Sequence, residues 1–371
     1  MFGQGSLMPS GTPGPTMKSL DQIEPRTPIS SLPFTINSSG AYYLTKNITV
    51  SGSTAGITVS ADNVVVDLKG FTLTGGGSGG VAGISIGSQK NVVVRNGIIT
   101  NWNIGGISAS GCSNAIFEKL LTTLGVVGTG LAAGTDCIIR DCISSYNGGG
   151  GFTSGDGCSL LNCVGTGNAS PISVGGFSLG NSVTVLNCKA TNNGSSSNAP
   201  GFRVVDNCLI SHCTSSENFS GDGINTGKGC RVVDCTVAGN SGNGISIQNG
   251  GTIQGCTVRS NGANGIIGVN NCSFTGNTCD GNNTGNSSSN GGILANGTGS
   301  TIDSNSCTSN GNGGGIIALN NHNLIIRNSC SGNGFNYNIP GTSNGNAFGP
   351  VVDMSAGGAI SNTNPWTNWI H

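Results

Sequence analysis

The hydrophobic pattern of the chain is periodic. A glycine followed by a large apolar residue recurs every 21 to 27 residues through most of the sequence. A fixed period of this length predicts a stack of similar structural units. Twelve apolar residues hold this anchor position, one for each predicted unit: Ile57, Ile84, Ile107, Leu131, Phe152, Phe177, Phe202, Ile224, Ile245, Ile266, Ile293 and Ile316.

Within each unit the apolar residues form short alternating pairs, which is the pattern of brief strands that turn one face inward. The unit that begins at Ile245 continues with Ile247, Ile253, Cys256 and Val258. The alternation slips by one residue before Cys256, and such a slip is what a corner in the chain would produce. Each unit is therefore predicted to be a coil of three strands and three corners.

A single coil cannot bury its apolar face, so neighbouring coils must stack in parallel and share one core. Parallel crossover connections are right-handed in nearly all cases. The sequence thus predicts an all-β, right-handed parallel β-helix of about twelve coils. At about 4.8 Å per coil, the rod would be roughly 60 Å long.

Asparagine recurs at a fixed place, sixteen or seventeen residues after the anchor. Asparagine tolerates the left-handed backbone conformation of tight corners, and its amide can hydrogen-bond to copies above and below. The sequence therefore predicts a structural amide ladder along one corner, formed by Asn147, Asn168, Asn193, Asn218, Asn240, Asn261, Asn282, Asn310 and Asn333.

Most of the fifteen cysteines lie six or eleven residues after an anchor and should point into the core. Stacked residues hold their β-carbons about 4.8 Å apart, whereas a disulfide needs about 3.8 Å. We therefore predict free thiols that act as small apolar fillers. No CxxC pair occurs, so neither a metal site nor a cofactor is predicted.

Phe152, Phe177 and Phe202 share the anchor column and are predicted to stack in the core rather than to form a sugar platform.

Composition narrows the function. Only 8% of residues are charged and the formal net charge is −1. The scattered basic residues leave no stripe for nucleic acid, and no apolar run is long enough to cross a membrane. No signal peptide is visible at the start of this chain. We nevertheless expect an extracellular or cell-surface location for a protein of this kind.

The two ends differ from the repeats. Residues 1–15 are predicted to form an extended tail rich in proline and glycine, residues 16–50 an N-terminal cap, and residues 51–338 the β-helix. Residues 339–371, which include Trp366 and Trp369, are predicted to form a C-terminal cap or docking segment. A nearly neutral surface and open strand edges at the ends favour self-association through these end segments.

Several stretches resemble a known group of proteins. RTPISSLPFTINSSGAYYLTKNITV, GITVSADNVVVDLKGFTLTG, NVVVRNGIIT and the closing FGPVVDMSAGGAISNTNPWTNW are similar to bacterial right-handed parallel β-helix repeat proteins with the pectin-lyase-like fold. The resemblance spans residues 26–371. It implies the fold but not the function, because the fold hosts lyases, hydrolases, spikes and adhesins.

Candidate catalytic residues are few. The Asn-Thr-Asp, Asp-Asp, Gly-His-Gly and Arg-Ile-Lys segments of galacturonan hydrolases with this fold do not occur. Asp136 and Asp156 fall in successive coils and form the nearest approach to a carboxylate pair. His212 and Asp234 fall ten residues after successive anchors, which would stack an imidazole on a carboxylate, while Ser211 is expected to face differently. Corner polarity and a surface hydrogen bond are the favoured explanations for both pairs.

Three functions are compatible with these observations. The leading prediction is a non-enzymatic structural or adhesive protein that assembles into filaments, because the sequence is devoted to ladders and offers no convergent polar site. The first alternative is a polysaccharide lyase or glycoside hydrolase with a glycan groove along one sheet. The second alternative is a non-catalytic glycan-binding spike or adhesin.

Overall fold

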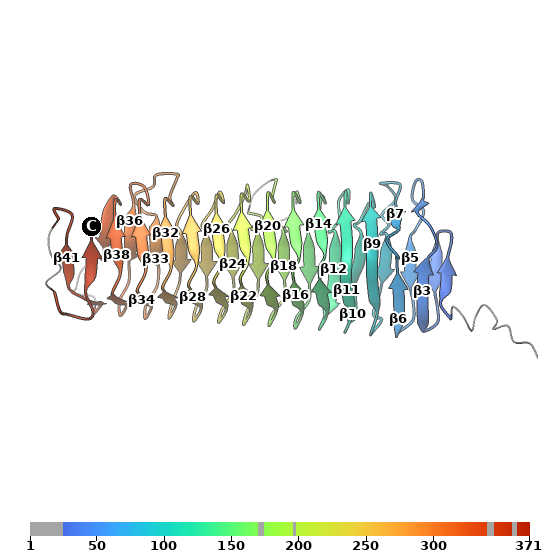
Figure 1. The fold of residues 1–371 in the computed structure, drawn as a ribbon, viewed down its shortest axis with the longest axis horizontal. Coiled ribbons are helices and arrows are strands. Elements are labelled where there is room, and N and C mark those ends of the chain that lie inside the picture. Colours follow the sequence, from blue (N-terminus) through green and yellow to red (C-terminus); the bar gives the residue numbers. More distant parts are fainter. Residues whose placement is uncertain (1–24, 170–173, 196–197, 340–344, 358–361) are drawn as a thin grey trace, which may run out of the picture.

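The chain forms a single elongated rod (Figure 1). The structure is a computed structural model, and it describes residues 25–169, 174–195, 198–339, 345–357 and 362–371. All its regular elements in these ranges are β-strands, which wind as a right-handed parallel β-helix from β1 (Thr27–Ile29) at one end to β41 (Val351–Asp353) and β42 (Asn368–Ile370) at the other. Among the described residues there is no helix of sufficient length and apolar character to cross a membrane.

One face of the rod is a parallel sheet that we call sheet B, to which each coil contributes one strand. The twelve predicted anchors are paired with one another in register along this sheet, as in Phe177 with Phe202 and Phe202 with Ile224. The same register extends one coil further at each end, to Phe34 and to Tyr337. The described strands of sheet B are β2 (Phe34–Ile36), β5 (Ile57–Val59), β8 (Ile84–Ile86), β10 (Ile107–Ser113), β12 (Leu131–Thr135), β15 (Phe152–Ser154), β18 (Phe177–Leu179), β21 (Phe202–Val204), β24 (Ile224–Thr226), β27 (Ile245–Ile247), β30 (Ile266–Gly268), β33 (Gly291–Ala295), β36 (Gly314–Ala318) and β39 (Phe335–Asn338).

The rest of each coil belongs to a second, sharply bent parallel sheet that we call sheet A. Most coils contribute two short strands to it, and the turn between them contains one residue with a left-handed backbone, such as Asp234 with φ of 52°. This residue is the corner that the slipped alternation predicts. Besides β1, β41 and β42, the described strands of sheet A are β3 (Gly40–Leu44), β4 (Ile48–Thr49), β6 (Val64–Asp67), β7 (Thr72–Thr74), β9 (Val93–Thr100), β11 (Ile116–Thr123), β13 (Ile138–Arg140), β14 (Ile143–Ser145), β16 (Ser159–Leu161), β17 (Val164–Thr166), β19 (Thr184–Leu186), β20 (Lys189–Thr191), β22 (Leu209–Ser211), β23 (Thr214–Ser216), β25 (Arg231–Val233), β26 (Thr236–Ala238), β28 (Thr252–Gln254), β29 (Thr257–Arg259), β31 (Ser273–Thr275), β32 (Thr278–Asp280), β34 (Thr301–Asp303), β35 (Ser306–Thr308), β37 (Leu324–Ile326), β38 (Ser329–Ser331) and β40 (Ala347–Phe348).

The predicted asparagine ladder is present and buried. The backbone amide and side-chain Nδ2 of Asn218 both donate to Oδ1 of Asn240, at 3.1 and 2.7 Å. Asn240 donates in the same way to Oδ1 of Asn261, at 3.0 and 2.9 Å. The expected reason for asparagine is only half right, because the residue before each ladder position adopts the left-handed conformation, as Tyr146 and Glu217 do. Asparagine is used here for its amide.

The ladder also explains the glycine before each anchor. A β-carbon on Gly201 would lie 2.6 Å from Nδ2 of Asn218, and one on Gly223 would lie 2.6 Å from Nδ2 of Asn240. Such contacts are too close for any side chain. Each ladder amide therefore occupies the space that glycine leaves, and the two columns require each other.

The cysteines are buried free thiols, as predicted. They do more than fill space, because they occupy corner positions like those of asparagine. The amide of Cys163 donates to Sγ of Cys188 at 3.4 Å, and that of Cys188 donates to Sγ of Cys213 at 3.4 Å. The same column continues with Asn277, whose Oδ1 accepts from the amide of Cys256 at 2.9 Å. Sulfur thus replaces an amide oxygen as the acceptor between coils.

The aromatic stack is confirmed. The rings of Phe152 and Phe177 are 4.9 Å apart with planes 13° from parallel, and those of Phe177 and Phe202 are 4.6 Å apart at 15°. All three side chains are completely buried. They fill the core beneath sheet B and leave no aromatic platform on the outside at these positions.

Asp67, on the outer side of β6, joins charges from three coils. It lies 3.2 Å from Arg95 Nε and 3.9 Å from Arg26 Nη1, and its Oδ1 accepts from the Lys69 amide at 2.9 Å and from Asn96 Nδ2 at 3.2 Å. Burial alone would raise the pKa of Asp67. The hydrogen bonds from Lys69 and Asn96 and the charge of Arg95 outweigh burial and hold the pKa below its ordinary value.

Removing one ladder amide should destabilise the rod. In Asn240→Ala the amide and Nδ2 of Asn218 lose their buried acceptor, so the free energy of unfolding should fall by about 3 kcal/mol. Denaturant unfolding monitored by circular dichroism measures this. The exposed Asn312 is the matched control, and Asn312→Ala should change stability by less than about 0.5 kcal/mol. Equal effects at the two sites would contradict a structural role for the ladder.

The thiols should be unreactive toward thiol reagents in the folded protein. All fifteen are buried inside the rod, so a reagent in solution cannot reach their sulfur atoms. A colorimetric thiol reagent should therefore find almost no reactive sulfur under native conditions and all fifteen after unfolding without reductant. A lower count in denaturant would reveal disulfides and overturn this interpretation.

Asp67 should make stability depend on pH. Because its folded pKa is depressed, its contribution is present above the unfolded value of about 3.9 and is lost as the pH falls through the folded pKa. The melting-temperature difference between the unaltered protein and Asp67→Asn should be largest near neutral pH and shrink below about pH 4. A difference that is constant with pH would argue against this charge network.

Candidate functional site

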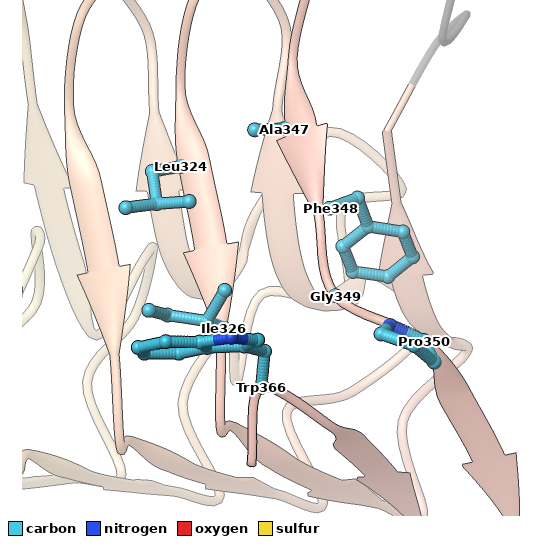
Figure 2. Close-up of a pocket in the computed structure, with 7 residues that line it drawn as sticks. All are labelled: Leu324, Ile326, Ala347, Phe348, Gly349, Pro350 and Trp366. Atoms are coloured by element: carbon cyan, nitrogen blue, oxygen red, sulfur yellow. The ribbon is translucent and has the colours of Figure 1, made fainter. Parts of the chain in front are cut away.

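Two hollows on the rod differ in chemistry. The first has a volume of about 370 Å³ and lies at the C-terminal end, where Leu324 and Ile326 of β37 face β40 and the segment that follows it (Figure 2). Trp366 lies against Ile326, and its ring is half exposed and 5.5 Å from the guanidinium carbon of Arg327. The lining residues, Leu324, Ile326, Ala347, Phe348, Gly349, Pro350 and Trp366, include no titratable group. This hollow can contact apolar surface but offers no acid or base.

The second hollow is polar and lies near the middle of the rod. It has a volume of about 270 Å³ and is lined by Asn198, Pro200, Arg203, Asp222 and Asn225. Its floor is the outer face of sheet B at β21 and β24, next to the strand β18 that is labelled in Figure 1. In β21 the side chains of Phe202 and Val204 enter the core, so the alternation of the strand directs Arg203 outward. We take this polar pocket as the candidate active site.

Asp222 is the first member of a second ladder, which runs along the edge of sheet B. Its Oδ1 accepts from the amide of Asn243 at 2.8 Å and from Nδ2 of Asn243 at 3.0 Å. Asn243 Oδ1 then accepts from the amide and Nδ2 of Asn264, at 3.1 and 3.0 Å. The next two coils thus use asparagine where this coil uses aspartate. One amide-type oxygen is all that the ladder needs at this position.

The second carboxylate oxygen of Asp222 faces the outer side of sheet B. Oδ2 accepts from Nδ2 of Asn225 at 3.0 Å and from the hydroxyl of Ser246 at 2.6 Å. Asn225 and Ser246 are the outward residues of β24 and β27, so two coils hold this oxygen in place. The charge of Asp222 is therefore fixed at the pocket rather than free on a loop.

Arg203 brings a positive charge to the same pocket. It is exposed, and it forms no ion pair with any residue in the described part of the chain. By contrast, Arg95, Arg140 and Arg327 each pair with a carboxylate on sheet A. A guanidinium has five donors in a planar fork that matches a carboxylate. Arg203 is thus available to an anionic ligand.

The structure brings His212 and Asp234 together as the sequence indicates. His212 Nε2 lies 3.8 Å from Asp234 Oδ2, and the two side chains are 64% and 52% exposed. The expectation that Ser211 faces differently is wrong, because its Oγ lies 2.7 Å from Nδ1 of His212 in a hydrogen bond. His212 and Asp234 are exposed on the outer side of sheet A, Ser211 is buried, and none of the three lines either hollow. The preference for a surface hydrogen bond over a catalytic role at this pair stays a prediction.

Asp136 and Asp156 also lie in successive coils. The amide of Asp136 donates to the carbonyl of Asp156 at 2.9 Å, so the two residues are neighbours. Oδ1 of Asp156 accepts from the amide and Nδ2 of Asn181, at 2.7 and 3.1 Å. Asp156 therefore serves a corner ladder between coils. The preference for corner polarity over a catalytic role at these two carboxylates likewise stays a prediction.

Sequence reasoning missed Arg203 and Asp222, although the pattern holds a signal for both. The outward residue after each anchor is small in five earlier coils, and Arg203 interrupts this run of Ser85, Ser108, Ala132, Thr153 and Ser178. Two residues before the anchor, Asp222 stands in the column of Asn243 and Asn264. A comparison of columns, rather than of catalytic motifs, would have found them.

The pocket has a limited chemical repertoire. Asp222 is its one carboxylate among the lining residues, whereas glycoside hydrolysis needs two carboxyl groups that flank the scissile bond. A cation beside a fixed carboxylate suits a different task, the removal of a proton next to an acidic group that the cation neutralises. Within the described ranges, no group of three or more His, Cys, Asp or Glu side chains is placed to hold a metal ion.

Comparisons with known proteins support the fold. No protein-family model and no curated protein matches the sequence. Among solved structures, the A-module of the Azotobacter vinelandii mannuronan C-5 epimerase AlgE4 is similar with a TM-score of 0.52 at 14% identity, over 83% of this chain and 91% of that chain. The AlgE6 A-module gives a TM-score of 0.45 at 13% identity over 84% and 89% of the two chains, and the Dettilon tailspike protein gives 0.45 at 16% over 90% and 61%.

The chain therefore has the right-handed parallel β-helix of the pectin-lyase-like proteins, and the resemblance found in the sequence is confirmed. The leading prediction of a non-enzymatic structural or adhesive protein is corrected, because the rod that this chain resembles at a TM-score of 0.52 is an enzyme module. The premise of that prediction also fails, since polar groups do converge at Arg203 and Asp222. A rod built on ladders can still carry an active site.

Proposed function

We propose that this protein is a polysaccharide lyase that acts on an acidic glycan lying along the outer face of sheet B. The observation that carries the proposal is the guanidinium of Arg203, which has no ion pair among the described residues, in one polar pocket with the fixed carboxylate of Asp222. The hydrolase alternative is less well supported, because the pocket lining contains one carboxylate rather than two.

Arg203 would bind the carboxylate of a uronate ring with its planar fork of donors. Neutralising that carboxylate makes the adjacent C–H bond more acidic. Asp222 then accepts the proton, and the electron pair of the C–H bond forms a carbon–carbon double bond. The glycosidic oxygen leaves from the neighbouring carbon and takes a proton from water, which completes the elimination.

Asn225 and Ser246 have a positioning role in this proposal. Both donate to Oδ2 of Asp222, so they fix the direction of the oxygen that accepts the proton. Their strands are neighbours in sheet B, and this rigid scaffold keeps the geometry constant. No cofactor enters the proposed step.

We also propose that the protein works outside the cytoplasm, at the cell surface or beyond it, where polymeric glycans are met. The fifteen buried thiols are compatible with this location, because their packing inside the rod protects them from oxidants.

Self-association through the end segments stays a prediction. The exposed Trp366 at the C-terminal hollow is the residue that such a contact would use first.

Incubation with mannuronan, pectate and neutral α-1,3-glucan in heavy water tests the proposed reaction. We expect unsaturated sugar ends, detected by ultraviolet absorbance, from an acidic glycan and none from the neutral one. Arg203→Ala and Asp222→Asn should each lower turnover at least about a hundredfold, because each removes a group that acts on the reacting centre. Arg231→Ala should leave the rate within about twofold, since Arg231 is also exposed but lies on sheet A.

The outcomes separate the candidate functions. Deuterium incorporation without cleavage would indicate that the protein inverts the configuration at this carbon and does not eliminate the glycosidic oxygen. Release of reducing sugar from the neutral glucan would favour a hydrolase, and binding without any product would favour the non-catalytic glycan-binding protein. Full activity of both pocket variants would rule out this pocket as the active site.

A further inference from the structure

A third hollow lies around the corner from the polar pocket. It has a volume of about 460 Å³ and follows the bend between the second strand of each coil in sheet A and the strand of sheet B. Its lining comes from four successive coils and consists of Asn218, Phe219, Gly239, Asn240, Ser241, Ser260, Gly262, Thr284 and Gly285. None of these residues is charged. We call this hollow the corner groove.

Phe219 is the exceptional residue of the corner groove. Its side chain is 64% exposed, although the fold requires no large residue at this place. The residue directly after the ladder asparagine is small or polar in the neighbouring coils, as in Gly148, Ala169, Gly194, Ser241 and Gly262. A single exposed aromatic ring is common on protein surfaces, but this one lines a groove and therefore offers its apolar face to a ligand that occupies the groove.

The rest of the groove suits the polar edge of a ligand. The hydroxyls of Ser241, Ser260 and Thr284 make no hydrogen bond to any other residue in the described ranges, so their donors and acceptors are available. Gly239 lies between them, and a β-carbon there would meet nothing closer than Glu217 Cγ at 3.6 Å, so the backbone is open to a ligand at this point. An aromatic face next to unpaired hydroxyls matches the apolar face and hydroxyl rim of a sugar ring.

We propose that the corner groove is a saccharide subsite in which a sugar ring stacks on Phe219 and exchanges hydrogen bonds with Ser241, Ser260 and Thr284. The absence of charge in the lining indicates that it recognises the uncharged face of the ring. Asp222 lies only three residues after Phe219 along the chain, so the subsite continues the glycan path from the polar pocket around the corner. In this respect the inference rests on the proposed function.

Calorimetric titration of Asp222→Asn tests the subsite without turnover, with hexasaccharides of galacturonate and of glucose as probes. Adding Phe219→Ala to this protein should weaken binding of at least one probe about tenfold, as expected when an exposed ring loses roughly 50 Å² of apolar contact. Phe219→Trp should retain or tighten binding. Phe335→Ala is the matched control, because Phe335 is also a half-exposed phenylalanine, and it should leave the affinity unchanged.

Unchanged affinity after Phe219→Ala would overturn the subsite, and so would the absence of measurable binding of both hexasaccharides. The result is independent of catalysis. If the unaltered protein forms no product but binding depends on Phe219, the lyase proposal fails and the subsite stands. If elimination occurs but Phe219→Ala has no effect, the subsite alone is wrong.

Discussion

The structure depends on one constraint, the registered stacking of a buried amide at one corner of every coil. The ladder asparagines each donate twice to the asparagine of the next coil, as Asn218 does to Asn240, and each occupies the space left by the glycine before the anchor of its own coil. A side chain at that glycine would collide with the amide, and a different residue in the ladder would leave buried donors without acceptors. The glycine and asparagine columns therefore set the register of the coils. The stacked phenylalanines and the thiol column follow from that register.

The same constraint distinguishes surface residues that the fold requires from those that it does not require. Because each coil repeats its neighbours, every position belongs to a column whose structural requirement can be taken from the other coils. Asp222 carries a charge where Asn243 and Asn264 meet the requirement of the ladder with an amide. Arg203 interrupts a run of small outward residues that extends from Ser85 to Ser178, and Phe219 stands where the neighbouring coils have Gly194 and Ser241. These three departures lie in adjacent coils near the middle of the rod, and together they define the region where we place glycan binding and chemistry.

Much of the fold was predictable from the sequence, because a solenoid turns a local period into a global architecture. The anchors, the asparagine ladder, the free thiols and the aromatic stack follow from spacing alone. The left-handed residues were misplaced by one position, since propensity does not distinguish asparagine chosen for its backbone from asparagine chosen for its amide. The site was missed because Arg203 and Asp222 belong to different columns of the repeat. That both line one pocket depends on their side-chain conformations, which the repeat pattern does not specify. The hydrogen bond between Ser211 and His212 was missed for a similar reason, since side-chain direction at a corner does not follow strand alternation.

At position 222, folding requires only an oxygen that accepts the two ladder hydrogen bonds from Asn243. The negative charge of Asp222 is not needed for folding. The free energy of unfolding of Asp222→Asn, compared with that of the unaltered protein, tests this claim most directly. We predict a difference within about 1 kcal/mol, because an asparagine oxygen can accept both hydrogen bonds from Asn243. A loss of about 3 kcal/mol, as large as that from an unsatisfied ladder amide, would contradict it and return Asp222 to a structural role.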